Sequence, residues 1–107
     1  MITDEEAERA VDYLRDSAPK AAQARANKEY VSEFRKVLKA QIMRENPSDP
    51  IGTQEAKAYS DPRYQAHLQA IKEAVEADAH AVFLRDAAQA RIDAWRSQES
   101  SRRAGLA

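Results

Sequence analysis

The fold is decided by one stretch, residues 19–46, which reads PKAAQARANKEYVSEFRKVLKAQIMREN. Placed on a helix at about 100° per residue, its large apolar side chains gather on one face centred on Phe34. The members of this face are Ala26, Tyr30, Phe34, Val37, Leu38 and Ile42. Most of the cations gather on the opposite face. Two such distinct faces predict an amphipathic helix over residues 19–46, with Tyr30 and Phe34 in the core.

The charge of the chain is segregated along its length. Residues 1–18 carry a net charge of −4 and residues 19–46 a net charge of +4, although the whole chain sums to −1. The cations that share one face are Arg25, Lys28, Arg35, Lys36 and Lys39. Phosphates repeat along a nucleic-acid strand, so a row of cations is typical of a site for an extended polyanion. The alternative is a solvated helix face, supported by acids one turn away.

Composition predicts an all-α protein. Among 107 residues there are only 2 Gly and 4 Pro, while 33% are charged, a balance typical of long helices. Much of the apolar content is alanine, so a single copy would bury a thin core, and self-assembly is one way to compensate. We therefore expect one helical domain, coiled-coil-like, which forms a homo-oligomer rather than a self-contained bundle.

Local signals set the first boundaries. Thr3 and Glu6 match a capping box, which begins an acidic helix over residues 1–18. Pro19 is poorly tolerated inside a helix but suits the start of a new one, so a break or kink is expected at residues 17–19.

The second half of the chain begins with residues 47–61, which are expected to form a loop with a short helix that Thr53 caps. Asp61 as N-cap and Pro62 as the first helical residue then begin a long C-terminal helix over residues 62–104. The sequence thus predicts two to four helices, the last of them long.

An apolar stripe follows this long helix and drifts around it near residues 78–82, as a stutter in a coiled coil would. The drift leaves Phe83 on a second side. Alanines along the stripe allow close helix approach, which favours contacts between subunits. The predicted oligomer interface consists of Phe83, Leu84, Ala88, Ile92 and Trp95.

A second group of cations lies near the C-terminus, where residues 81–107 sum to +2. The candidate nucleic-acid ligands here are Arg91, Arg96, Arg102 and Arg103. Arginine binds phosphate through a fork of donors. Trp95 lies among them and could stack on a base, but its place on the apolar stripe favours a core or interface role.

Residues for catalysis are missing from the sequence. His67 and His80 lack the spacing of a metal-binding pair, two glycines cannot form a phosphate-binding loop, and there is no cysteine. The sequence therefore predicts no enzyme, no metal and no cofactor. It also contains no secretory leader and no run of about 20 apolar residues, which predicts a cytoplasmic protein without membrane contact.

Three segments together resemble the small helical recombination proteins of bacteriophages, including the UvsY-type recombination mediators. They are the basic helix at residues 25–43, the Asp-Pro-x-Tyr sequence at residues 61–64, and the closing helix at residues 88–98. The resemblance implies an oligomer that binds single-stranded DNA and helps to load a RecA-like recombinase onto strands occupied by a single-strand-binding protein. The short length, the acidic first helix and the proline-rich loop depart from that family.

The function expected from the sequence is therefore non-specific binding of single-stranded DNA by an oligomeric recombination accessory protein. Lys28, Arg35, Lys36 and Lys39 would correspond to the family's cationic helix, and Arg91 and Arg96 to its basic C-terminal helix. The alternative is a helical adaptor or phage structural or regulatory protein that binds no nucleic acid and docks a partner beside Phe83. In either case the acidic first helix could act as a DNA mimic or cover the basic face.

Overall fold

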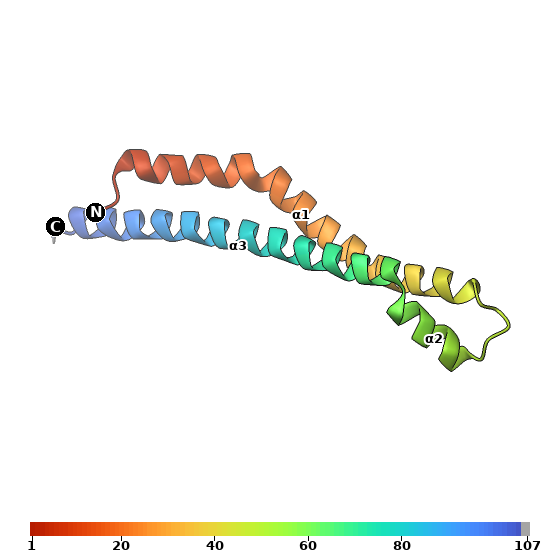
Figure 1. Ribbon diagram of the computed structural model, residues 1–107. Coiled ribbons are helices and arrows are strands. Elements are labelled where there is room, and N and C mark those ends of the chain that lie inside the picture. The colour runs from red at the N-terminus through yellow and green to blue at the C-terminus, as the bar shows by residue number, and fades with distance from the viewer. Residues whose placement is uncertain (106–107) are drawn as a thin grey trace. The chain divides into compact units, whose positions relative to one another are not determined.

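The computed structural model describes residues 1–105 of the chain as three helices and no strand (Figure 1). They are α1 (Asp4–Arg44), α2 (Ile51–Ser60) and α3 (Pro62–Arg103). The prediction of an all-α protein with one long C-terminal helix is confirmed. The chain divides into two compact units, the first formed by Met1–Gln23 with the chain from Ala79 onward and the second by Ala24–Asp78.

Of the break or kink predicted at residues 17–19, the break is absent, because α1 is a single helix that contains Pro19. The acidic and basic segments are therefore parts of one element. Proline lacks the N–H that would bond the carbonyl four residues earlier, here that of Arg15. Both residues are exposed, so water can bind this carbonyl instead. The alanines that follow, Ala21 and Ala22, are the strongest helix formers and favour continuation.

The first unit is held by small side chains. Ala10 of α1 packs with Ala88 and Ile92 of α3, and half-buried Leu14 covers this cluster. The N-terminus is fixed to α3 by a reciprocal pair of hydrogen bonds, in which the Ile2 N–H donates to Gln98 Oε1 at 2.7 Å and Gln98 Nε2 donates to the Ile2 carbonyl at 2.8 Å. Alanine allows close helix approach but buries little area, so this core is thin, as the composition predicted.

The second unit has a more varied core because α2 closes its end. Ile42 of α1, Ala58 of α2 and Tyr64 of α3 form the buried cluster, with Leu38 and Met43 packed against it. Here Ile42 is only 2% exposed. Short loops on both sides of α2 bring these three residues together. The segment predicted as a loop with a short helix thus contributes Ala58 to the core.

The helix starts follow the predicted capping chemistry with one exception. The Thr3 hydroxyl accepts from the Glu6 N–H and Glu6 Oε2 accepts from the Thr3 N–H, which completes the capping box. Asp61 Oδ1 accepts from the Arg63 N–H at 2.8 Å, as an N-cap should. The exception is α2, which begins at Ile51 after Pro50 rather than at Thr53, without a side-chain cap.

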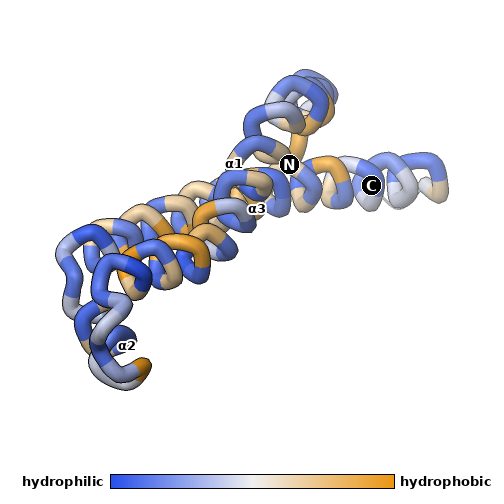
Figure 2. Tube along the Cα trace, turned by 90° about the vertical axis from the view of Figure 1, so that its right-hand side faces the viewer, coloured by the Kyte–Doolittle hydropathy of each residue, from blue (hydrophilic) through white to orange (hydrophobic). Residues whose placement is uncertain are grey.

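The predicted core face of α1 is only partly correct. Ile42 is buried and Leu38 and Phe34 are half-buried, but Tyr30 is 66% exposed and Val37 47% exposed. The covered positions of this part of α1 recur at intervals of three and four residues, namely Ala24, Lys28, Val31, Phe34, Leu38 and Ile42. This seam runs between the centres of the predicted apolar and basic faces, and it leaves Tyr30 and Val37 exposed. Hydrophobic and hydrophilic positions are interspersed along the long helices (Figure 2).

Candidate nucleic-acid interface

The cationic row predicted from the sequence lies on α1 within the second unit, but its five members have different surroundings. Two of them point to Asp78 of α3, one lies against α2, and two remain on the solvent side. The acidic segment 1–18 takes part in no ion pair with them among the described residues.

Arg25 and Lys28 share one carboxylate. Arg25 Nε lies 3.2 Å from Asp78 Oδ1, and Lys28 Nζ lies 2.9 Å from Asp78 Oδ2. Asp78 is 7% exposed, whereas the Arg25 side chain keeps half of its surface in solvent. The hydrogen bond from Lys28, together with that from Arg25, holds the pKa of the Asp78 carboxyl below its ordinary value. Lys28 is thus committed to the interior of the unit, while the other edge of Arg25 stays accessible.

Lys39 is held against α2. Its ammonium donates to the Tyr59 hydroxyl at 2.8 Å, lies 4.7 Å from the Tyr59 ring centroid, and is 3.8 Å from Glu55 Oε1. The hydrogen bond with Tyr59 is the main reason why the pKa of Lys39 is raised above its ordinary value. The side chain therefore stays charged, but it joins α1 to α2 instead of standing free.

Arg35 and Lys36 form the open part of the row. Both residues are exposed, and Arg35 has no ion pair among residues 1–105. Lys36 Nζ lies 3.4 Å from Glu33 Oε2, a contact between two side chains that are each at least 70% exposed. Such a pair is weak and screened by salt, so an anion in solution can compete with Glu33.

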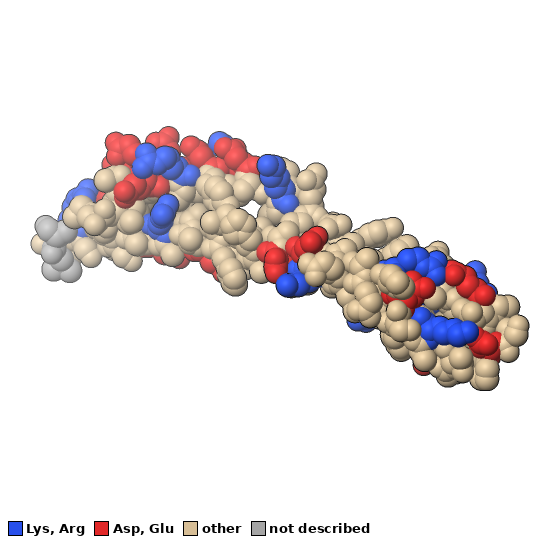
Figure 3. Space-filling model, viewed as in Figure 1, with Lys and Arg blue, Asp and Glu red and all other residues tan. Residues whose placement is uncertain are grey.

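The C-terminal arginines lie on α3 within the first unit. Arg91, Arg96 and Arg103 are exposed and make no ion pair within the described part of the chain, while Arg102 bonds Glu99 at 3.0 Å. Acids of α1 lie close to cations in this unit, so positive and negative atoms alternate on the visible face (Figure 3). On that face the positive atoms of this unit are interrupted by negative ones (Figure 3).

The predicted oligomer interface on α3 needs correction. Ala88 and Ile92 are buried against Ala10 within the chain itself, so they are not available to a second subunit. The Trp95 indole N–H donates to Asp4 Oδ1 at 2.8 Å, which ties Trp95 to α1 as well. Only Phe83, 69% exposed, and Leu84, 42% exposed, keep the surface that the prediction requires.

Asp78 is the functional-site residue that sequence reasoning missed. It was placed only in the region where the apolar stripe drifts, although its position has a readable signal. Asp78 lies four residues after Ala74 and three before Ala81, which is the 3–4 spacing of an inward-facing seam. A carboxylate at such a position requires a cation opposite it, because an uncompensated buried charge is costly.

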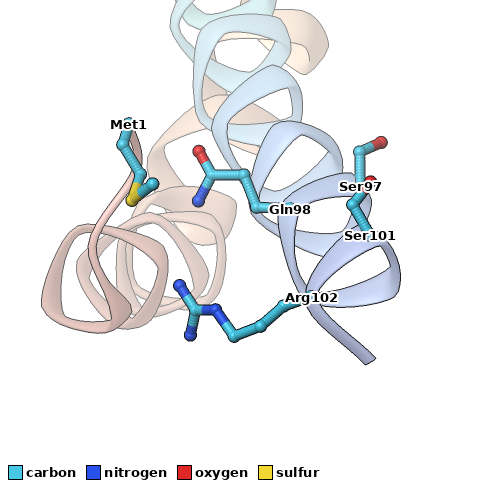
Figure 4. Close-up of a pocket in the computed structure, with 5 residues that line it drawn as sticks. All are labelled: Met1, Ser97, Gln98, Ser101 and Arg102. Atoms are coloured by element: carbon cyan, nitrogen blue, oxygen red, sulfur yellow. The ribbon is translucent and has the colours of Figure 1, made fainter. Parts of the chain in front are cut away.

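A hollow in the first unit offers no catalytic chemistry. It has a volume of about 390 Å³ and is lined by Met1, Ser97, Gln98, Ser101 and Arg102. Gln98 and Arg102 reach from α3 toward the N-terminal helix, whereas the two serines point away from it (Figure 4). None of these side chains is a general base. The described residues also contain no cluster of metal-binding side chains.

None of the described helices combines the length and the apolar character that crossing a membrane requires. A comparison of the chain with protein families, curated proteins and solved structures found no match.

Proposed function

We propose that this chain is a non-enzymatic accessory protein that binds single-stranded DNA with little sequence preference. The observation that carries the proposal is the position of Arg35 and Lys36, which lie side by side in sequence and are both exposed to solvent. The half-exposed guanidinium of Arg25 lies on the same helix, ten residues earlier.

The binding mode follows from this arrangement. Phosphates would replace water and Glu33 around Arg35 and Lys36, with release of counterions. Tyr30 is exposed and close to these cations in sequence, but it lies on another face of α1 and stacks on Phe34. Base stacking is therefore expected to contribute little, and contacts to the nucleic-acid backbone carry no sequence information. Lys28 and Lys39 are not expected to contribute, because Asp78 and Tyr59 already hold them.

Two or three cations per chain give weak binding, which self-association would strengthen. When several copies are joined, each further contact to the same strand becomes intramolecular, and the overall affinity rises without any new kind of contact. An oligomer of this kind matches the recombination mediators that the sequence resembles. Loading of a RecA-like recombinase onto DNA covered by a single-strand-binding protein is then the proposed role.

The test is fluorescence anisotropy of a labelled single-stranded oligonucleotide over a salt series. For two phosphates neutralised per chain, the logarithm of affinity should fall against the logarithm of salt with a slope near −1.4. Arg35→Glu with Lys36→Glu should abolish binding. The matched control, Arg9→Glu with Lys72→Glu, makes the same change of charge at two other exposed positions and should keep most of the binding. A flat salt response, or equal losses in both variants, would overturn the proposal.

A helical adaptor without nucleic-acid binding is the second candidate, carried by the exposure of Phe83 and Leu84. These neighbours present apolar surface on α3 of the first unit, as a docking site for a partner helix would. The same titration separates the two candidates. An adaptor predicts no binding to the oligonucleotide at low salt, and none when two of the six acids of residues 1–18 are neutralised by Glu5→Gln with Glu8→Gln.

A further inference from the structure

An uncharged face of α1 within the second unit has no role in DNA binding as proposed. Tyr30 and Val37 are largely exposed and Phe34, between them, is half-buried. The Tyr30 and Phe34 rings stack with their centroids 5.9 Å apart, and the Phe34 ring lies 5.6 Å from the ring of His67. His67 Nε2 in turn donates to the Val31 carbonyl at 2.6 Å. The aromatic side chains thus form a ridge that is fixed on the helix.

The ridge is uncharged from Ala26 to Gln41. Its positions on α1 are Ala26, Asn27, Tyr30, Phe34, Val37 and Gln41, and the charged residues Glu33 and Arg44 lie at its edge and its end. This is notable in a chain with 33% charged residues. A neutral apolar ridge can be desolvated without burying a charge, so it suits a permanent helix–helix contact better than a solvent face.

The exposed area of the chain is sufficient for such a contact. The chain exposes 7709 Å², whereas a folded monomer of its mass is expected to expose about 6,000 Å². The excess of about 1,700 Å² is roughly twice the 800 Å² that each partner loses in an interface of standard size. The interior buries little apolar area, because alanine makes up five of the eight buried apolar residues in the described chain.

We propose that a second copy of this chain packs on the Tyr30–Phe34–Val37 ridge, α1 against α1 and antiparallel, about a two-fold axis near Phe34. Tyr30 precedes Phe34 by four residues and Val37 follows it by three, so at about 1.5 Å per residue they lie at nearly equal distances on either side. A two-fold axis therefore brings Tyr30 of each copy to Val37 of the other. The residues of the ridge itself bring no charges together across this axis. The inference does not rest on DNA binding.

The oligomeric mass tests this arrangement. In light scattering after gel filtration, the full-length chain should have twice its 12.0 kDa mass. Tyr30→Glu with Val37→Glu should reduce the mass to that of one chain, with an unchanged far-UV circular dichroism spectrum. The control, Phe83→Glu with Leu84→Glu, changes two exposed apolar residues of the first unit and should remain a dimer. A wild-type monomer at the highest concentration reached, or dissociation by the control pair alone, would overturn the proposal.

Cysteine cross-linking tests the register without a destabilising charge, since the natural chain has no cysteine. A mixture of the Tyr30→Cys and Val37→Cys proteins should form the mixed disulfide faster than either protein pairs with Phe83→Cys. Equal rates would contradict the proposed axis. Arg35→Glu with Lys36→Glu should keep the dimer mass, so loss of DNA binding and loss of the dimer are separate outcomes.

Discussion

Lys28 Nζ lies 2.9 Å from Oδ2 of Asp78, which is almost fully buried, and this contact joins positions 50 residues apart in the chain. Arg25 bonds the other oxygen of the same carboxylate. One acid therefore removes a lysine from the predicted cationic row and sets which face of α1 meets α3. The Asp78 carboxylate thus connects the packing of the second unit to the charge available at its surface.

The first prediction concerns the pH dependence of stability. The folded-state pKa of Asp78 lies below its ordinary value of 3.8, so the ionised carboxylate stabilises the fold above that pH, and this contribution is lost as the pH falls through the lowered value. Urea unfolding should therefore show Asp78→Asn to be less stable than the natural chain at pH 7. The difference should shrink at pH 3.

Asp86→Asn is the control for this experiment, because Asp86 lies on the same helix with its side chain 63% exposed. Its effect on the free energy of unfolding should be small at both pH values. A difference between Asp78→Asn and the natural chain that stays constant from pH 7 to pH 3 would contradict the assigned role of the carboxylate.

The second prediction concerns the effect of Asp78→Asn on DNA binding, because Asp78 pairs with two cations of the predicted row. Asp78→Asn frees Lys28 and the second edge of Arg25 from their ion pairs. In the anisotropy titration, the magnitude of the salt slope should rise by up to about 1.4, since each phosphate contact adds about 0.7 on a single strand. The circular dichroism spectrum must first show that the variant remains helical. An unchanged slope in a folded variant would show that the row is not the DNA site.

The starts of α1 and α3 could be predicted from the sequence because their chemistry is local, whereas α2 begins at Ile51 without a side-chain cap. Thr3 and Glu6 satisfy each other's N–H groups, Asp61 accepts from the Arg63 N–H, and Pro62 has no N–H to satisfy. The continuity of α1 through Pro19 could not be predicted in the same way. It depends on whether the freed carbonyl reaches water, and hence on which side of the helix is covered.

The face of α1 that packs could not be predicted either. Tyr30 and Val37 contribute strongly to the hydrophobic pattern because they are large, yet both are exposed, whereas the seam that packs includes Ala24 and Lys28. Lysine is a seam residue here only because Asp78 lies opposite it. The periodicity of one helix does not reveal that Lys28 will pair with Asp78, a residue fifty positions later in the chain.

The third prediction tests this seam by core truncation. Ile42→Ala removes a side chain that is 2% exposed, and it should lower the free energy of unfolding by about 2–5 kcal/mol. Val11→Ala removes the same kind of side chain from a position that is 51% exposed and should cost less than about 0.5 kcal/mol. Urea denaturation followed by circular dichroism measures both. Similar losses for the two variants would contradict the burial pattern.

The fourth prediction concerns Pro19. Proline inside a helix costs about 3 kcal/mol relative to alanine, through the lost hydrogen bond and the clash with the preceding turn. In the turn before Pro19, the Ser17 hydroxyl donates to the Tyr13 carbonyl at 2.6 Å. Since α1 continues through Pro19, Pro19→Ala should raise the free energy of unfolding by up to about 3 kcal/mol.

Two matched changes separate a local helix effect from other causes. Pro19→Gly should stabilise the chain by about 1 kcal/mol less than Pro19→Ala, because glycine is the poorer helix former. Ala22→Pro, one turn later at another exposed position, should destabilise it by about 3 kcal/mol. Urea unfolding of the three variants gives the order Pro19→Ala, Pro19→Gly, Ala22→Pro from most to least stable. If Pro19→Ala is instead less stable than the natural chain, the fold requires a local distortion at Pro19, and α1 is better described as two helices.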